Sequence, residues 1–110
     1  MYQLSWGVAQ DYKLAVSLFT YACDKGYASG CSDLGWMYEH ELGVARDYYR
    51  AANLYETACT GGTAYGCAYL GHLYRVGTGV GKDIERARTL LKKGCDMGSQ
   101  QGCDELKAMQ

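Results

Sequence analysis

The chain has 110 residues, and its 11 Lys and Arg against 12 Asp and Glu give a net charge of −1. This length suits one domain, and the near-neutral charge argues against a protein that binds nucleic acid or anionic membranes, which carries a basic excess. Hydrophobic residues make up 48% of the chain, too many for a disordered protein. No apolar run approaches the roughly 18 residues of a membrane span, and residues 1–7 do not have the pattern of a signal peptide.

The cysteines follow an internal repeat. Cys23, Cys59 and Cys95 are 36 residues apart, and so are Cys31, Cys67 and Cys103. The same offset aligns columns of Gly, Asp, Ala and Leu along the chain. A fixed period of this length is typical of a solenoid built from one small structural unit.

The first predicted helix begins after Asp11, whose carboxylate is a good N-cap for the unpaired N–H groups of a first turn. Apolar residues then recur at helical spacing on one face: Ala15, Leu18, Phe19, Ala22 and Cys23. Gly26 is predicted to end this segment in the left-handed conformation that suits a helix C-terminus.

The second predicted helix carries Cys31, Leu34, Gly35 and Tyr38 on one face. A glycine inside a helix costs about 1 kcal/mol relative to alanine. The recurrence of this glycine in the next unit, as Gly71, indicates that a neighbouring helix comes too close for a side chain. A loop over residues 39–46 follows.

The same two helices return along the chain. A helix after Asp47 and another after Asp83 repeat the first one, each followed by a glycine cap at Gly62 or Gly98. Residues 67–74 repeat the second helix, and a loop over residues 76–82 follows. The last helix, within residues 100–110, is polar, as expected of a capping helix.

The predicted fold is therefore all-α, a right-handed α/α solenoid of stacked helix–turn–helix units. We divide its single array into a partial unit over residues 1–27, repeats over 28–63 and 64–99, and a capping helix over 100–110. Met1 and Tyr2 align with Met37 and Tyr38, at the end of a second helix. We therefore expect the chain to be the C-terminal part of a longer array, ending close to its natural C-terminus.

The unit reads Gly-Cys-x-x-Leu-Gly-x-x-Tyr, then Gly-Val-x-x-Asp-x-x-x-Ala-x-x-Leu-Tyr-x-x-Ala-Cys-x-x-Gly. It resembles the Sel-1-like repeat, a relative of the tetratricopeptide repeat, over essentially the whole chain. The doubled cysteines resemble its cysteine-rich branch, which includes secreted bacterial proteins and a protein of the mitochondrial intermembrane space. The resemblance implies a scaffold for protein–protein contacts, and some cysteine-rich members were named β-lactamases.

The resemblance also implies one disulfide in each helical hairpin, pairing Cys23 with Cys31, Cys59 with Cys67 and Cys95 with Cys103. Six buried free thiols remain the alternative. A zinc site is less favoured, because its cysteines are usually two to four residues apart and only His40 and His72 could assist. Disulfides place the protein in an oxidising compartment: we expect it to be secreted or periplasmic, or in the intermembrane space if it is eukaryotic.

No catalytic motif is complete. The loop Gly77–Asp83 resembles a phosphate-binding loop, but Asp83 follows Lys82 where that motif requires Ser or Thr. No Ser is followed three residues later by Lys, as the serine β-lactamases require. We predict no catalytic residue, metal or cofactor. A weak β-lactamase or penicillin-binding protein, suggested only by family names, and a structural spacer in a longer protein are the alternatives.

A partner is expected on the variable face of the second helices, which by resemblance to tetratricopeptide arrays lines a concave groove. This face carries Ser29, Ser32, Asp33, Trp36, Glu39 and His40, then Tyr65, Ala68, Tyr69, His72, Arg75 and Val76, and finally Gln101, Asp104, Glu105 and Ala108. Aromatic anchors within a polar rim are typical of a protein-binding hot spot.

The predicted partner-binding residues are Asp33, Trp36, Glu39, His40, Tyr65, Tyr69, His72 and Arg75, and the predicted partner is a protein or peptide bound by a monomer. Packing between units is the alternative role for Trp36, Tyr65, Tyr69 and His72. Tyr38, Tyr55 and Tyr74 occupy repeat columns and are predicted to pack. Of the adjacent pair Tyr48 and Tyr49, the first is predicted to pack and the second to be exposed.

Overall fold

The structure is a computed structural model that describes residues 6–109. This part of the chain forms helices and no strand. The helices are α1 (Trp6–Asp24), α2 (Ala28–His40), α3 (Tyr48–Thr60), α4 (Ala64–Val76), α5 (Ile84–Asp96) and α6 (Gln100–Ala108). The alignment of Met1 and Tyr2 with a second helix lies outside the described residues.

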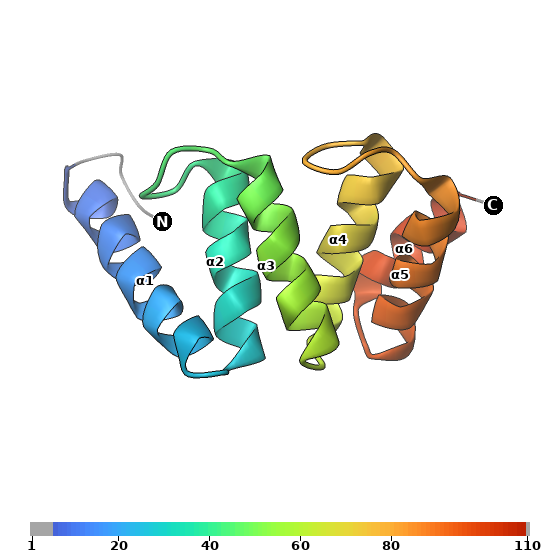
Figure 1. Cartoon of the computed structure of the whole chain (residues 1–110), viewed down its shortest axis with the longest axis horizontal. Coiled ribbons are helices and arrows are strands. Elements are labelled where there is room, and N and C mark those ends of the chain that lie inside the picture. Colours follow the sequence, from blue (N-terminus) through green and yellow to red (C-terminus); the bar gives the residue numbers. More distant parts are fainter. Residues whose placement is uncertain (1–5, 110) are drawn as a thin grey trace.

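The helices stand side by side along a long axis of 43 Å (Figure 1). Each packs against the next in the chain, and α2 also contacts α4, as α4 contacts α6. The odd-numbered helices make no such contact with one another within residues 6–109. The even-numbered helices therefore form the more closely spaced layer, which we call the inner layer. The predicted α/α solenoid is confirmed.

Aspartates begin two of the helices as predicted. The side chain of Asp47 accepts a hydrogen bond from Arg50 N, and that of Asp83 accepts one from Arg86 N, both at 3.0 Å. The prediction for Asp11 is wrong, because α1 begins at Trp6 and Asp11 lies inside it.

The backbone of both capping residues is also held by the preceding helix. Asp47 N donates to Tyr38 O at 3.1 Å, and Asp83 N donates to Tyr74 O at 2.9 Å, so the preceding helix holds each loop extended up to its cap. The equivalent acceptor for Asp11 belongs to Tyr2, which lies outside the described residues.

Glycines allow the close helix packing that their recurrence predicts. A Cβ on Gly35 would lie 2.8 Å from Tyr55 Cε1, and one on Gly71 would lie 2.8 Å from Leu91 Cγ. Tyr55 and Leu91 are fully buried, so α3 packs tightly on α2 and α5 on α4. The cap prediction also holds, since Gly26 has a φ of +93°.

All three predicted disulfides are present. Cys23–Cys31 joins α1 to α2, Cys59–Cys67 joins α3 to α4, and Cys95–Cys103 joins α5 to α6. Their Cα–Cα distances of 4.5 to 4.6 Å lie within the normal range for a disulfide. No cysteine remains free in the described part of the chain, which excludes the alternatives of free thiols and of a zinc site.

Candidate partner-binding face

The predicted site residues lie on the inner layer, on helices that are one unit apart. Asp33, Trp36, Glu39 and His40 come from α2, and Tyr65, Tyr69, His72 and Arg75 come from α4. Glu39 and His40 are helical, although the sequence placed them in a loop, so their side chains continue the face begun by Asp33 and Trp36.

Two positions of the predicted variable face do not belong to it. Ser32 and Ala68 are buried. A Cβ on Gly94 of α5 would lie 3.0 Å from Ala68 N, which shows that Ala68 packs against the odd-numbered layer. Both positions hold small buried residues, and the prediction that they belong to the groove-lining face is wrong.

Four rings form a continuous surface across α2 and α4, which we call the aromatic cluster: Trp36, His40, Tyr65 and Tyr69. The centroid of Trp36 lies 3.9 Å from that of His40 and 5.3 Å from that of Tyr69. Tyr65 stacks on Tyr69 with centroids 6.0 Å apart. Trp36 and Tyr69 therefore pack between units, as the alternative role predicts, while Trp36 stays 39% exposed and Tyr65 57% exposed.

Tyr55 supports this surface from below. Its ring centroid lies 5.1 Å from that of Tyr69, and its hydroxyl donates a hydrogen bond to Glu39 Oε1 at 2.6 Å. Burial, followed by the hydrogen bond to Glu39, raises the pKa of the Tyr55 hydroxyl, which therefore stays protonated as the donor. The core role predicted for Tyr55 is confirmed, and one carboxylate oxygen of Glu39 already accepts its hydrogen bond.

Asp33 stands at the edge of the aromatic cluster. Its carboxylate makes no ion pair or hydrogen bond with another side chain among residues 11–109, and partial burial raises its pKa. Burial also raises the pKa of Tyr69, with smaller contributions from Tyr65, Asp33 and Glu39. The two carboxylates of α2 thus lie close enough to Tyr69 to place a negative potential on that ring.

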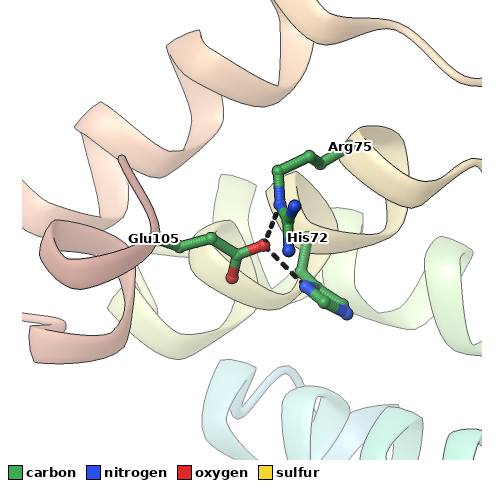
Figure 2. Close-up of polar contacts among 3 residues, drawn as sticks. All are labelled: His72, Arg75 and Glu105. Atoms are coloured by element: carbon green, nitrogen blue, oxygen red, sulfur yellow. Dashed lines mark hydrogen bonds and ion pairs between the residues drawn. The ribbon is translucent and has the colours of Figure 1, made fainter. Parts of the chain in front are cut away.

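The remaining predicted residues, His72 and Arg75, contact α6 (Figure 2). Glu105 Oε2 lies 2.6 Å from His72 Nδ1 and accepts a hydrogen bond from Arg75 Nε at 2.5 Å. The Glu105 side chain is only 11% exposed, whereas His72 and Arg75 are about one-third exposed. This cluster holds the last helix against α4, so His72 and Arg75 have an internal partner.

Glu105 is the residue that the predicted site lacked. Asp33, Tyr69 and Glu105 occupy one repeat position, 36 residues apart. Tyr69 contacts Trp36 in the preceding inner helix, and Glu105 contacts His72, which lies 36 residues after Trp36. The two contacts join equivalent positions of successive units, so the repeat alignment could have revealed the role of Glu105.

Residues 6–109 contain no helix that is both long enough and apolar enough to span a bilayer. The same residues hold no group of three or more His, Cys, Asp or Glu side chains placed to bind a metal ion.

Comparison with known proteins identifies the repeat. The family model described as Sel1 repeat matches residues 1–27, 28–63 and 64–99, which is nearly the whole chain. The chain belongs to the Sel1 repeat family. Sel1 repeats are generally non-enzymatic scaffolds that mediate protein interactions. The sequence has no match among curated proteins.

Solved Sel1-type structures superpose well on this chain. Helicobacter pylori cysteine rich protein B is 26% identical, with a TM-score of 0.77 over 92% of this chain and 90% of that one. The protein c5321, a protective antigen of uropathogenic Escherichia coli with an SLR fold, is 29% identical, with a TM-score of 0.80 over 86% of this chain. A Sel1 repeat protein from Oxalobacter formigenes, 21% identical with a TM-score of 0.79 over 86% of this chain, shares the fold. This Sel1 chain spans only 20% of the E. coli protein and 39% of the Oxalobacter protein.

Proposed function

We propose that this Sel1 array binds a peptide segment of a partner protein across α2 and α4, on the aromatic cluster. The observation that carries the proposal is the pair of exposed rings, Trp36 and Tyr65, joined through the half-buried Tyr69. Both rings are exposed to solvent in the free protein. Large aromatic side chains lose little conformational entropy on binding and often dominate interface energetics.

The framework below the aromatic cluster favours a preformed site. Tyr69 rests on the fully buried Tyr55, and the disulfide Cys59–Cys67 fixes α4 against α3. A surface that is ordered before binding loses less free energy when it captures a flexible peptide. The general role of Sel1 repeats as interaction scaffolds agrees with this proposal.

We also propose that the protein works in an oxidising compartment outside the cytoplasm. The support is the set of three disulfides, one in each hairpin, since such bonds persist mainly in secreted, periplasmic and comparable environments.

Peptide selection tests the binding proposal. A random peptide display library is selected on the oxidised protein, and binding of the enriched peptides is followed by the fluorescence of Trp36 in a Trp6→Phe background. We expect saturable binding that Tyr65→Ala weakens at least about tenfold, as loss of a hot-spot ring does. Tyr49→Ala is the matched control, because Tyr49 is a 69% exposed tyrosine on α3.

Circular dichroism of each variant first confirms that the fold is retained. Enriched peptides that bind Tyr65→Ala as tightly as the parent protein, or that lose affinity only with Tyr49→Ala, would place binding elsewhere and contradict the proposal.

A further inference from the structure

The aromatic cluster is flanked by negative charge on α2. Asp33 lies three residues before Trp36 and Glu39 lies three residues after it, so all three share one side of the helix. Residues 28–40 contain no Lys or Arg. The Nε2 of His40 lies 3.9 Å from Glu39 Oε1.

The basic side chains of α4 do not pair with these carboxylates. Arg75 and His72 both contact Glu105 of α6. The surface formed by Trp36 and Tyr69 therefore has the carboxylates of Asp33 and Glu39 close to Tyr69, and no Lys or Arg is bound to it among residues 11–109.

Other tyrosines of the protein show what such rings bind here. Arg50 lies over the ring of Tyr38, and Arg86 lies over that of Tyr74, each at 5.2 Å from the centroid. A cation over an aromatic face is attracted by the ring, and tryptophan is the strongest of these acceptors. Trp36 carries no such cation from the described residues, although it is exposed.

Glu105 shows what a carboxylate at this repeat position binds. It occupies the position of Asp33 two units later, and its partners include the guanidinium of Arg75. Among residues 11–109, Asp33 makes no ion pair of this kind. A carboxylate whose pKa is raised by burial gains free energy when a cation joins it.

We propose that the surface formed by Trp36 and Tyr69, with Asp33 and Glu39 beside it, binds an arginine or lysine side chain of the partner peptide. This inference rests on the proposed function and specifies the chemistry of the partner. The cation lies over the exposed ring of Trp36, and its N–H groups donate to Asp33 and to the oxygen of Glu39 that does not accept from Tyr55. Net attraction in this arrangement combines a cation–π contact with charge-assisted hydrogen bonds.

The test uses the peptides selected on the protein. Each is remade with citrulline in place of arginine, or norleucine in place of lysine, one position at a time. We expect one position in each peptide where removing the charge weakens binding about tenfold or more. Asp33→Asn is expected to weaken binding of the charged peptide by a similar factor while leaving the neutral peptide nearly unchanged, which is the coupling that a direct contact requires.

Asp24→Asn is the matched control. Asp24 is an exposed aspartate at the end of α1, and its substitution removes the same charge from another surface. Selected peptides that bind the aromatic cluster without a Lys or Arg, or that show no coupling to Asp33, would overturn this inference and leave the proposed function standing. Failure to obtain any peptide sensitive to Tyr65→Ala would overturn both. A concentration-dependent dimer that is disrupted by Tyr65→Ala would assign the face to a second copy of the chain and also overturn the inference.

Discussion

Substitution of Gly35 by alanine tests the close packing on which the aromatic cluster depends. The added Cβ would lie 2.8 Å from Tyr55 Cε1 and 3.2 Å from the carbonyl oxygen of Ala51. Tyr55 cannot retreat easily, because it is fully buried and its hydroxyl is bonded to Glu39. Either α2 and α3 separate or the ring leaves its position.

Two opposing effects set the magnitude. Alanine favours the helix by about 1 kcal/mol relative to glycine. Overpacking of a rigid core costs about 1–3 kcal/mol, and occasionally more. Since the contact is with a buried ring and a backbone oxygen, we expect the higher end of that range and a net loss of about 1–2 kcal/mol. For a domain of this size that loss lowers Tm by roughly 5–10 °C.

The assay is urea and thermal unfolding followed by circular dichroism without reductant. Gly81→Ala is the matched control, because a Cβ on Gly81 has no neighbour within 4 Å, and its stability is expected to be unchanged or slightly higher. A Gly35→Ala protein that is as stable as the parent, or more stable, would show that helix propensity prevails and would refute the close contact between α2 and α3.

Three further predictions concern caps, charge and disulfides, each measured as the free energy of unfolding in urea. Asp47→Ala removes the α3 cap and should lower the free energy of unfolding by about 1 kcal/mol, whereas Asp11→Ala should lower it little. An equal loss at both positions would contradict the finding that α1 begins at Trp6. Because the folded-state pKa of Asp33 is raised, its charged form destabilises the fold at neutral pH, so Asp33→Asn should be more stable there. That gain should disappear as the pH falls below the ordinary value of 3.8, and a gain that persists in acid would contradict the cause given. Replacing both Cys59 and Cys67 with serine should cost about 2–3 kcal/mol by the chain-entropy model, and an unchanged midpoint would show that the bond adds nothing to stability.

The fold could be predicted because its determinants are local and repeated. The 36-residue spacing of cysteines specifies hairpins, and glycines such as Gly35 mark where helices touch. Asp11 shows the limit of this reasoning. Its sequence context matches that of Asp47, but Asp11 lies inside α1. The same residue in a repeat column therefore does not always begin a helix.

The candidate site could be predicted only in part. Helical spacing places Trp36 and Tyr69 on one layer, and the structure brings them together. Spacing alone does not show which side chains of that layer already have internal partners. His72 and Arg75 bind Glu105 through a contact between units, and Glu39 binds Tyr55 through a contact between layers. Such contacts depend on how neighbouring units are offset.

The most direct test of a peptide-binding inner layer is a structure of the complex in solution. Isotope-filtered nuclear Overhauser contacts between a selected peptide and the labelled protein locate the peptide without substitutions. The account predicts contacts from the peptide to the rings of Trp36, Tyr65 and Tyr69, with the largest amide shifts on α2 and α4. Contacts confined to the outward faces of α1, α3 and α5, with Trp36 unperturbed, would contradict it.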